Sequence, residues 1–356
     1  MELRIEQLPA GQRKNKCTDP TALGFGKYFT DHMLVADWSE ARGWYDARIV
    51  PYGPFQLEPS AAVFHYGQEI FEGLKAYRQP DGSIALFRPE MNLARFNGSA
   101  RRLAMPEVPA ELFIDGLCEL VRLEADWVPA ASGTSLYIRP AMIATEAALG
   151  VKPSREYRFF TILSPVGAYY ATGFKPIRLL MEEHLSRTAP GGTGAAKTGG
   201  NYAASLLAAR AAKERGFDQV LWLDSVEHRH VEEVGAMNIF FVIDGQLVTP
   251  PLSETILGGI TRDSLLQLAP SLGLAVAERP VAVAELLDGI RSCRVQEAFG
   301  TGTAAVVAPV GALGYRDDMF SIGDGAVGKV TQRLYNALTD IQYGRAADGL
   351  GWLRKL

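Results

Sequence analysis

Residues 190–202 read PGGTGAAKTGGNY, a run in which one lysine, Lys197, stands among glycine, alanine and threonine. Such small side chains leave room for a bulky molecule to lie against the backbone. A lysine in these surroundings is partly removed from water, which disfavours the charged ammonium. Because a neutral amine condenses with an aldehyde to a Schiff base, Lys197 is a candidate nucleophile. A solvated lysine in a flexible loop is the plainer interpretation of the same stretch.

The same stretch also resembles a nucleotide-binding P-loop. Residues 191–198 match G-x-x-x-x-G-K-[ST] except that Ala196 replaces the glycine before the lysine, and an apolar run ends further along at Asp224. A P-loop lysine opens a helix whose N-terminus holds phosphate. Here Gly199 and Gly200 follow the lysine almost directly, and two glycines disfavour the continuation of a helix. We therefore expect the helix to begin at Tyr202 after an Asn201 cap, which argues against a P-loop.

The overall composition is that of a folded globular chain. Of the 356 residues, 47% are hydrophobic and 21% are charged, which excludes a disordered chain. The net charge is −4, from 36 basic and 40 acidic residues, so there is no basic surplus to grip nucleic acid. The longest low-charge stretch, residues 301–315, is too short to cross a bilayer. Residues 1–16 are polar and carry no apolar signal region. We therefore expect neither a nucleic-acid nor a membrane partner.

The cysteines and histidines predict neither a disulfide framework nor a metal site. Cys17, Cys118 and Cys293 are far apart and form no C-x-x-C pair. His228 and His230 are close in sequence, but no third ligand clusters with them. We expect a protein of a reducing compartment, located in the cytoplasm.

Strands and helices alternate in both halves of the chain, which predicts an α/β or α+β fold in two domains. We expect a small domain over residues 1–165, a connector rich in glycine and proline over 166–176, and a large domain with Lys197 over 177–356. The predicted strands are 30–38, 47–51, 84–88, 135–145, 157–163, 177–181, 219–224, 239–243, 275–280 and 293–299. The predicted helices are 90–103, 111–126, 202–215, 262–272, 281–290 and 326–342.

Several motifs in a fixed order make the interpretation specific. The segment from Lys197 to Tyr202, KTGGNY, resembles the lysine segment of pyridoxal-phosphate enzymes of fold type IV, and more closely that of the branched-chain amino acid aminotransferases. Further matching segments are FGKYFTDHM (25–33), HYG (65–67), FEGLKAY (71–77), YIRP (137–140), EVGAMN (233–238), TPPL (249–252), ILGGITR (256–262) and FGTGTA (299–304). The resemblance covers about residues 20–345.

The resemblance implies a two-domain fold with pyridoxal 5′-phosphate in the interdomain cleft. Lys197 would be the covalent anchor and would move the proton at the substrate Cα. Glu233 would hold the pyridine nitrogen protonated, which makes the ring an electron sink. Tyr202 would donate a hydrogen bond to the ring oxygen. The phosphate would be bound by the amides of Ile260 and Thr261 at a helix N-terminus, together with Thr303 and Arg95.

The resemblance also implies a substrate site for small apolar amino acids. Phe25, Phe71 and Tyr137 would line an apolar pocket, and Val151 would be contributed by a loop of the partner subunit in a homodimer. The carboxylates of the substrates would be received by Tyr66, Arg139 and the amides of Thr303 and Ala304. Apolar walls with a few carboxylate donors would let one site admit both leucine and glutamate. Ala236 stands where some members carry threonine, so one hydroxyl is missing there.

The activity implied is reversible transfer of the amino group of L-leucine, L-isoleucine or L-valine to 2-oxoglutarate, giving a branched 2-oxo acid and L-glutamate. One site would serve both half-reactions, so the kinetics would be ping-pong. A D-amino acid aminotransferase or an aminodeoxychorismate lyase shares the fold and cofactor. An ATP-binding P-loop protein and a non-catalytic oligomeric scaffold are the alternatives of other classes.

Overall fold

The computed structural model describes residues 2–167 and 174–356, and the chain divides into two compact units. Unit 1 comprises Met1–Ala171, Ala196–Gly199 and Ile341–Leu356, and unit 2 comprises Thr172–Ala195 and Gly200–Asp340. The predicted connector, residues 166–176, lies largely outside the described residues. The short segment with Lys197 and the C-terminal residues group with unit 1, whereas the sequence-based division assigns both to the large C-terminal domain.

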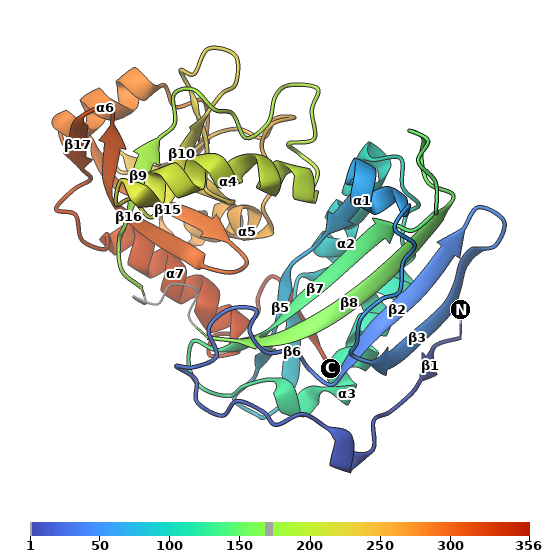
Figure 1. The fold of residues 1–356 in the computed structure, drawn as a ribbon. Helices are drawn as coiled ribbons and strands as arrows, with labels where there is room; N and C mark the ends of the chain where they lie inside the picture. Colours follow the sequence, from blue (N-terminus) through green and yellow to red (C-terminus); the bar gives the residue numbers. More distant parts are fainter. Residues whose placement is uncertain (1, 168–173) are drawn as a thin grey trace. The chain divides into compact units, whose positions relative to one another are not determined.

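Unit 1 is built on one mixed sheet with its helices beside it (Figure 1). Within the described residues the sheet has nine strands in the order β1-β3-β2-β8-β7-β5-β6-β18, with β4 paired to β7. These strands are β1 (Arg4–Ile5), β2 (His32–Ser39), β3 (Gly43–Pro51), β4 (Glu69–Phe71), β5 (Leu74–Arg78), β6 (Ile84–Phe87), β7 (Ser135–Ala144), β8 (Glu156–Val166) and β18 (Leu353–Lys355). The helices are α1 (Ala62–Tyr66), α2 (Pro89–Arg102) and α3 (Gly116–Leu123), with a π-helical turn Glu111–Asp115 and 3₁₀ turns Ala10–Gln12 and Ala125–Trp127.

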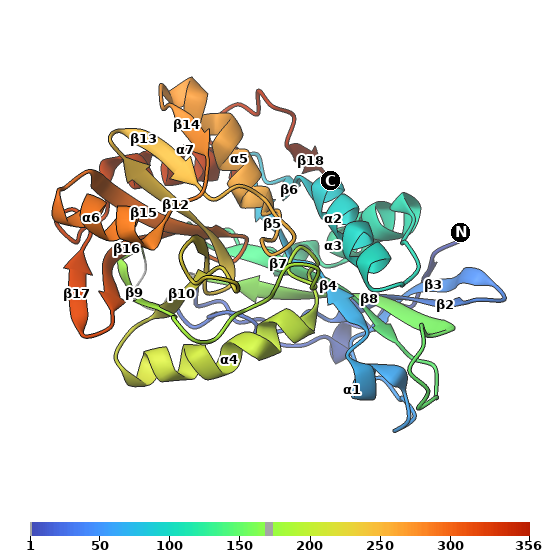
Figure 2. The ribbon, with the colours of Figure 1, turned by 90° about the horizontal axis from the view of Figure 1, so that it is seen from above.

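One face of this sheet packs on α2 and α3, and the other face carries polar and aromatic side chains. Leu74 and Ile138 pair across β5 and β7, and both lie in the core with Phe96 of α2 and Leu117 of α3. Side chains alternate along a strand, so the neighbours of Ile138, which include Tyr137, point to the opposite face. Figure 2 shows α2 and α3 beside the strands of this sheet.

Unit 2 contains a second sheet, which closes on itself. Among the described residues its order is β11-β10-β9-β16-β15-β12-β13-β14, and β11 also pairs with β12, so the first six strands form a ring. The strands are β9 (Ile177–Met181), β10 (Gln219–Leu223), β11 (Val231–Val234), β12 (Met237–Ile243), β13 (Gln246–Thr249), β14 (Val276–Glu278), β15 (Val295–Gly302), β16 (Val306–Tyr315) and β17 (Asp318–Ser321), which pairs with β16. The helices are α4 (Gly199–Glu214), α5 (Ile260–Leu268), α6 (Val283–Arg291) and α7 (Lys329–Gln342), and a 3₁₀ turn, Ala269–Leu272, follows α5.

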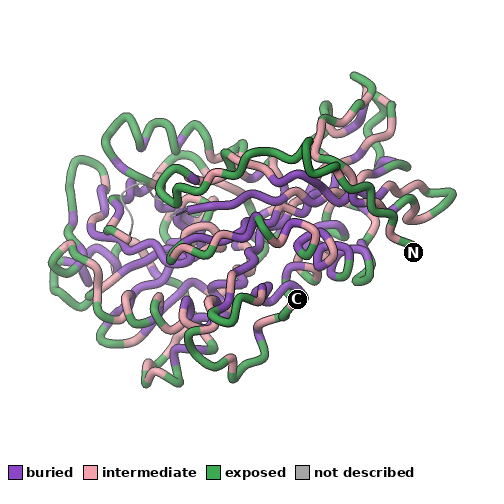
Figure 3. Tube along the Cα trace, turned by 90° about the horizontal axis from the view of Figure 1, so that it is seen from below, coloured by how far each residue is buried: buried purple, intermediate pink, exposed green. Residues whose placement is uncertain are grey.

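The central strands of both sheets, such as β7 and β12, are largely buried, and buried stretches of the chain are purple in Figure 3. The strand β12 is buried at every position and includes Phe240, whose ring stacks on Phe299 of β15 at 5.3 Å between centroids. No helix within residues 2–167 and 174–356 has both the length and the apolar run that crossing a bilayer requires. Cys17, Cys118 and Cys293 are all free thiols.

The start of α4 differs from the sequence-based expectation. The helix begins at Gly199, and not at Tyr202 with Asn201 as its cap. The side chain of Asn201 instead exchanges hydrogen bonds with Thr193, at 2.7 Å and 2.8 Å. The N–H of Gly199 donates to the Glu69 carboxylate, so an acceptor from β4 does the work of a cap. This tertiary bond outweighs the helix cost of glycine, which is about 1 kcal/mol per residue.

Asp224, the acidic residue at the end of β10, organises the loop that follows it. Its two carboxylate oxygens accept the backbone N–H groups of Val226, Glu227, Arg229 and His230 at 2.7–3.2 Å. Burial alone raises the pKa of a carboxyl group, but these four donors outweigh it and lower the pKa of Asp224 to about 2. The carboxylate is therefore occupied by its own loop and is not arranged as a magnesium ligand.

Asp224→Asn should lower the free energy of unfolding at pH 7 by about 1–2 kcal/mol, because the amide side chain accepts these N–H groups less strongly. Since the pKa is depressed in the folded state, this contribution is complete above about pH 4 and disappears as the pH falls towards 2. Urea unfolding at pH 7, 4 and 3 measures the difference, with the exposed Asp318→Asn as control. A difference that stays constant over this pH range would contradict the assignment.

Candidate active site

The backbone of Lys197 is hydrogen-bonded on both sides within unit 1. Its N–H donates to Ser99 Oγ of α2 at 2.8 Å, and its carbonyl accepts the N–H of Phe71, the last residue of β4, at 3.0 Å. The next residue, Thr198, donates from its hydroxyl to the carbonyl of Glu69 at 2.7 Å. The lysine is thus fixed to a helix and a strand, which does not fit a flexible loop.

The side chain of Lys197 belongs to a cluster of aromatic and cationic groups. Its Nζ lies 4.9 Å from the centroid of the Phe71 ring. The guanidinium of Arg139 lies over the same ring at 4.8 Å and donates to the hydroxyl of Tyr137 at 3.0 Å. The ring of Phe25 meets Tyr137 edge-on at 4.9 Å. The structure therefore brings five of the predicted residues together.

The same cluster includes a donor of Arg139 that its surroundings do not use. Arg139 Nε is buried and has no hydrogen-bond partner in the described part of the chain. A buried guanidinium donor without an acceptor is costly, and a carboxylate accepts such donors with suitable geometry. The cluster is therefore suited to receiving a carboxylate beside apolar rings.

Two predicted residues of unit 1 are exposed at the surface. The side chain of Val151 is 86% exposed, and Tyr66 is 40% exposed with its hydroxyl donating to the carbonyl of Leu149. Neither is among the buried residues.

Arg95 is held by a carboxylate that the sequence analysis did not single out. Its Nε and one terminal nitrogen donate to the two oxygens of Glu72, at 2.7 Å and 2.8 Å. Glu72 is fully buried and also accepts from Asn92 Nδ2 at 2.7 Å. A signal was present in the sequence, since an acidic residue flanked by the apolar residues Ile70, Phe71 and Leu74 has to be paired if it is buried.

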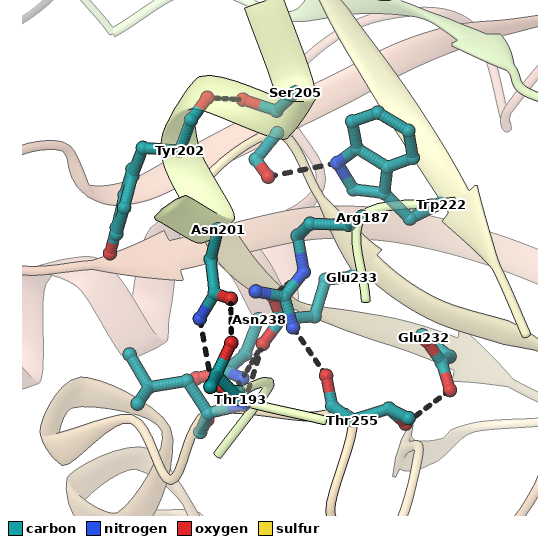
Figure 4. A network of polar contacts seen from close by, with 12 residues as sticks. Arg187, Thr193, Asn201, Tyr202, Ser205, Trp222, Glu232, Glu233, Asn238 and Thr255 are labelled. Atoms are coloured by element: carbon teal, nitrogen blue, oxygen red, sulfur yellow. Dashed lines mark hydrogen bonds and ion pairs between the residues drawn. The ribbon is translucent and has the colours of Figure 1, made fainter. Parts of the chain in front are cut away.

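In unit 2, Glu233 is the central buried carboxylate (Figure 4). Its Oε1 accepts the N–H of Leu257 at 3.0 Å and the side-chain amide of Asn238 at 3.2 Å, and its Oε2 forms an ion pair with Arg187 Nε at 3.1 Å. Its neighbour Glu232 accepts instead from the hydroxyl of Thr255. Arg187 and Asn238 were not among the predicted site residues. Arg187 lies in a loop, and the sequence gives no reason to distinguish an isolated loop arginine from a surface charge.

The contacts of Glu233 also fix the start of α5. Leu257 lies three residues before the helix, and its carbonyl accepts from Asn238 Nδ2 at 2.9 Å. The helix begins at Ile260 after Gly259, so Ile260 and Thr261 supply N–H groups of the first turn, which have no acceptor inside the helix. A Cβ at Gly259 would lie 1.9 Å from Asn238 Oδ1, so only glycine allows this close approach.

The turn after β15 lies at the same end of the sheet. In the strand register, Glu233 of β11 lies opposite Asn238 of β12, and Asn238 lies opposite Thr301 of β15. These three positions therefore form one row across the sheet. Thr303 and Ala304 follow Thr301 in the turn and are half-buried. The hydroxyl of Thr301 is buried without a hydrogen-bond partner in the described residues.

The loop before Lys197 is unsuited to phosphate, because protein acceptors already take its N–H groups. The side-chain carboxylate of Glu254 accepts a hydrogen bond from the N–H of Gly191 at 2.8 Å. The backbone carbonyl of Glu254 accepts one from the N–H of Ala195 at 2.9 Å. Gly192 donates to Ala189, and the carboxylate of Glu69 accepts from Gly199. Two carboxylates therefore lie where a P-loop would hold phosphate, and this excludes the nucleotide interpretation. The sequence-based argument against a P-loop relied on a helix start at Tyr202, which was wrong.

Each unit carries donors of the kinds that an aldehyde cofactor with a basic ring nitrogen and a phosphate needs. Unit 1 supplies an anchored lysine and an arginine, Lys197 and Arg95. Unit 2 supplies a buried carboxylate, Glu233, and a helix N-terminus at Ile260. Tyr202 lies in the first turns of α4, in the same unit as Glu233 (Figure 4). Among the described residues, no group of His, Cys, Asp and Glu side chains is placed to bind a metal ion.

The chain matches the family model "Amino-transferase class IV" over residues 69–313. A branched-chain-amino-acid aminotransferase of Mycolicibacterium smegmatis is 54% identical over 338 residues, covering 94% of this chain and 92% of that protein. Branched-chain-amino-acid transaminase 1 of Bacillus subtilis is 52% identical over 335 residues, covering 94% of each chain.

Solved structures agree in fold. The branched-chain amino acid aminotransferase of Escherichia coli superposes with a TM-score of 0.74 at 28% identity, covering 89% of this chain and 98% of that one. The T.th. branched-chain amino acid aminotransferase with pyridoxamine 5′-phosphate gives a TM-score of 0.75 at 31% identity, covering 90% and 97%. The same T.th. protein has also been solved with N-(5′-phosphopyridoxyl)-L-glutamate, at a TM-score of 0.74 and 31% identity, covering 90% and 97%.

The two glycines after Thr198 provide a matched pair of variants. A Cβ at Gly199 would lie 2.1 Å from Glu69 Oε1, whereas one at Gly200 meets nothing within 4 Å. Gly199→Ala should lower the free energy of unfolding by about 1–3 kcal/mol, because it displaces the carboxylate that caps α4. Gly200→Ala should leave it unchanged or raise it by up to about 1 kcal/mol. Equal effects of the two variants in urea unfolding would contradict the contact between Glu69 and α4.

Proposed function

The chain belongs to the amino-transferase class IV family, and from this premise we propose that it is a branched-chain amino acid aminotransferase that works with pyridoxal 5′-phosphate. The reaction is the reversible transfer of the amino group of L-leucine, L-isoleucine or L-valine to 2-oxoglutarate. Relatives of this name that match nearly end to end at 51–54% identity support the substrate class. The anchored Lys197 beside the Phe71 ring is the structural observation that carries the proposal.

The cofactor, when bound, supplies an electron sink for the carbanion formed at the substrate Cα. In unit 1, Lys197 would hold the cofactor and move the proton at the substrate Cα, and Arg95 would bind the phosphate. In unit 2, Glu233 would hold the ring nitrogen protonated, and Tyr202 would donate to the ring oxygen. Ile260, Thr261 and Thr303 would also bind the phosphate. The helix N-terminus supports this role, because its N–H groups and dipole favour an anion.

The substrate residues divide by chemistry. Phe25, Phe71 and Tyr137 form the apolar wall that accepts a branched side chain. The edge-on contact of Phe25 with Tyr137, and the Arg139 guanidinium that lies over both Phe71 and Tyr137, keep the wall rigid. Arg139 receives a carboxylate, in keeping with its unused buried Nε. Tyr66 and the amides of Thr303 and Ala304 are the further carboxylate donors. A leucine side chain and the distal carboxylate of glutamate then use different parts of one site.

An absorption experiment tests the activity. The protein reconstituted with pyridoxal phosphate should show a visible-edge band that L-leucine changes and 2-oxoglutarate restores, and steady-state kinetics should give parallel double-reciprocal lines. Lys197→Ala should lower turnover by about 10²-fold to 10⁴-fold or more, since it removes the group that moves the proton. Lys213→Ala, an exposed lysine of α4, is the control.

Three results would contradict the proposal in different ways. A protein that stays colourless with the cofactor would remove the cofactor assignment. A band that responds only to D-amino acids would keep the fold and change the substrate class. Normal turnover by Lys197→Ala would remove Lys197 from its role.

A homodimer is part of the same proposal, and an exposed apolar patch supports it. The patch consists of Phe64, Tyr66, Leu149 and Val151, which are 40–86% exposed. Its two segments are joined, because Tyr66 donates to the carbonyl of Leu149 and Ala61 bridges to Ala147. A contiguous exposed apolar patch marks a binding surface. A second copy that covers it would receive Val151 beside its own substrate, as the resemblance implies.

Val151→Asp should weaken the dimer by at least about tenfold in dissociation constant, because it places a charge in an apolar contact. Val226→Asp changes a 73% exposed valine of unit 2 and should leave the dimer unchanged. Sedimentation velocity over a dilution series measures both. A wild-type monomer at micromolar concentration, or equal effects of the two variants, would overturn the assignment of this patch.

The cytoplasmic location expected from the sequence belongs to this proposal, and the three free thiols support it.

A further inference from the structure

Arg262 is a buried charged group that the proposed reaction has not yet used. It is the third residue of α5, and its side chain is only 4% exposed. One terminal nitrogen donates to the carbonyl of Pro250 at 2.9 Å and to the carboxylate of Glu278 at 2.5 Å. Its Nε is buried and meets no hydrogen-bond acceptor in the part of the chain that the structure describes. A buried guanidinium with an unused donor is costly, so its position calls for a reason other than packing.

The two acceptors tie the first turn of α5 to two adjacent strands. Pro250 directly follows β13, and Glu278 is the last residue of β14, where it lies opposite Thr249 in the strand register. Because Arg262 itself belongs to the first turn, the bonds from its side chain hold the helix at its N-terminal end. The direction in which α5 starts is therefore fixed by strands β13 and β14.

The segment that leads into α5 is tied to a different part of the same unit. The N–H of Leu257 donates to Glu233 Oε1 at 3.0 Å, and the carbonyl of Leu257 accepts from Asn238 Nδ2 at 2.9 Å. These partners lie on β11 and β12. The turn from Leu257 to Arg262 is thus held at both ends. Between them it carries the N–H groups of the first helical turn, which have no acceptor inside the helix.

We propose that Arg262 is a positioning residue, which holds the first turn of α5 so that its N–H groups stand at a fixed distance from the Glu233 carboxylate. The inference rests on the proposed function, in which these N–H groups bind the cofactor phosphate and Glu233 the ring nitrogen. A rigid cofactor needs its two binding groups at one separation. A turn that is already in place loses less freedom when the ligand binds, so the affinity is higher.

Arg262→Gln should weaken the binding of the phosphate but not that of the ring. The ratio of the affinities for pyridoxal phosphate and for pyridoxal, which has no phosphate, measures what the phosphate contributes. In Arg262→Gln this ratio should fall by at least about tenfold, because the N–H groups are no longer held in place. The affinity for pyridoxal should change by less than about twofold, because Glu233 keeps its own partners, Arg187 and Asn238. A general loss of structure would weaken both compounds alike.

A second variant separates the position of Arg262 from its charge. Glu278→Ala removes one of the two acceptors and leaves the guanidinium without its anion. If Arg262 acts by holding the turn, the affinity ratio should fall in Glu278→Ala as well, by less than in Arg262→Gln. If Arg262 acts through its charge, the loss of a nearby anion should instead raise the affinity for phosphate.

The experiment is an equilibrium titration of the cofactor-free protein with pyridoxal phosphate and with pyridoxal, followed by the visible-edge band. The melting temperature of each variant is measured beside it. Arg279→Gln is the matched control. Arg279 donates two hydrogen bonds to Glu285, at 2.7 Å and 3.0 Å, in the same unit, but this partner lies on α6 and not on a strand that holds α5. The affinity ratio of Arg279→Gln should equal that of the wild type.

The possible results separate the inference from the proposed function. A wild-type protein that binds neither compound, or binds both equally, would overturn the proposed cofactor site itself. A wild type that prefers pyridoxal phosphate, with an unchanged ratio in Arg262→Gln, an equal fall in Arg279→Gln or a rise in Glu278→Ala, would overturn only the role of Arg262. If Arg262→Gln does not fold, Glu278→Ala decides alone, and a ratio that fails to fall contradicts the inference.

Discussion

The position of the Lys197 amine depends on the two hydrogen bonds that fix its peptide groups to Ser99 and Phe71. A lysine side chain has four rotatable bonds, so a mobile backbone would leave the amine without a defined position. Here α2 and β4 hold the backbone, and the Phe71 ring lies beside the amine. The helix α4 begins two residues later, where Glu69 caps it, so the same strand that fixes the lysine also starts the helix.

Each unit contains a buried carboxylate that is paired with an arginine. Glu72 pairs with Arg95 in unit 1, and Glu233 pairs with Arg187 in unit 2. Both carboxylates also accept neutral donors, from Asn92 and Asn238 respectively. Ionised side chains are tolerated in a protein interior only when such partners are in place. Each unit therefore keeps charges of both signs at fixed places without a ligand, which reduces the reorganisation that binding to either pair requires.

The sequence predicts the long regular elements well, and it fails where tertiary contacts decide. The strand Ile177–Met181 has the predicted bounds, and α2 and α7 agree to within a few residues. The strand β16 was missed because it contains Gly311 and Gly314, which read as loop signals. A Cβ at Gly314 would lie 2.3 Å from the Phe217 ring, so the glycine serves a close approach that only the fold reveals. The sequence indicates that a buried Glu72 needs a partner, but it does not show that the partner is Arg95, because the two residues are far apart in the chain.

The choice between a phosphate loop and a lysine anchor shows which physical fact separates two interpretations of one motif. A phosphate loop and a lysine anchor both need small residues around the lysine, and in both a helix follows the lysine directly, as α4 does here. The two differ in which acceptors bind the N–H groups of the loop. Here they meet carboxylates, Glu254 and Glu69, which would repel a phosphate. The first-turn N–H groups of α5 have no acceptor within their helix, so an anion is better placed there than at the lysine loop. The glycines at 191–200 thus permit close packing around the lysine, whereas the glycine-rich turn at Gly258 and Gly259 leads into a helix N-terminus, the kind of backbone that favours an anion.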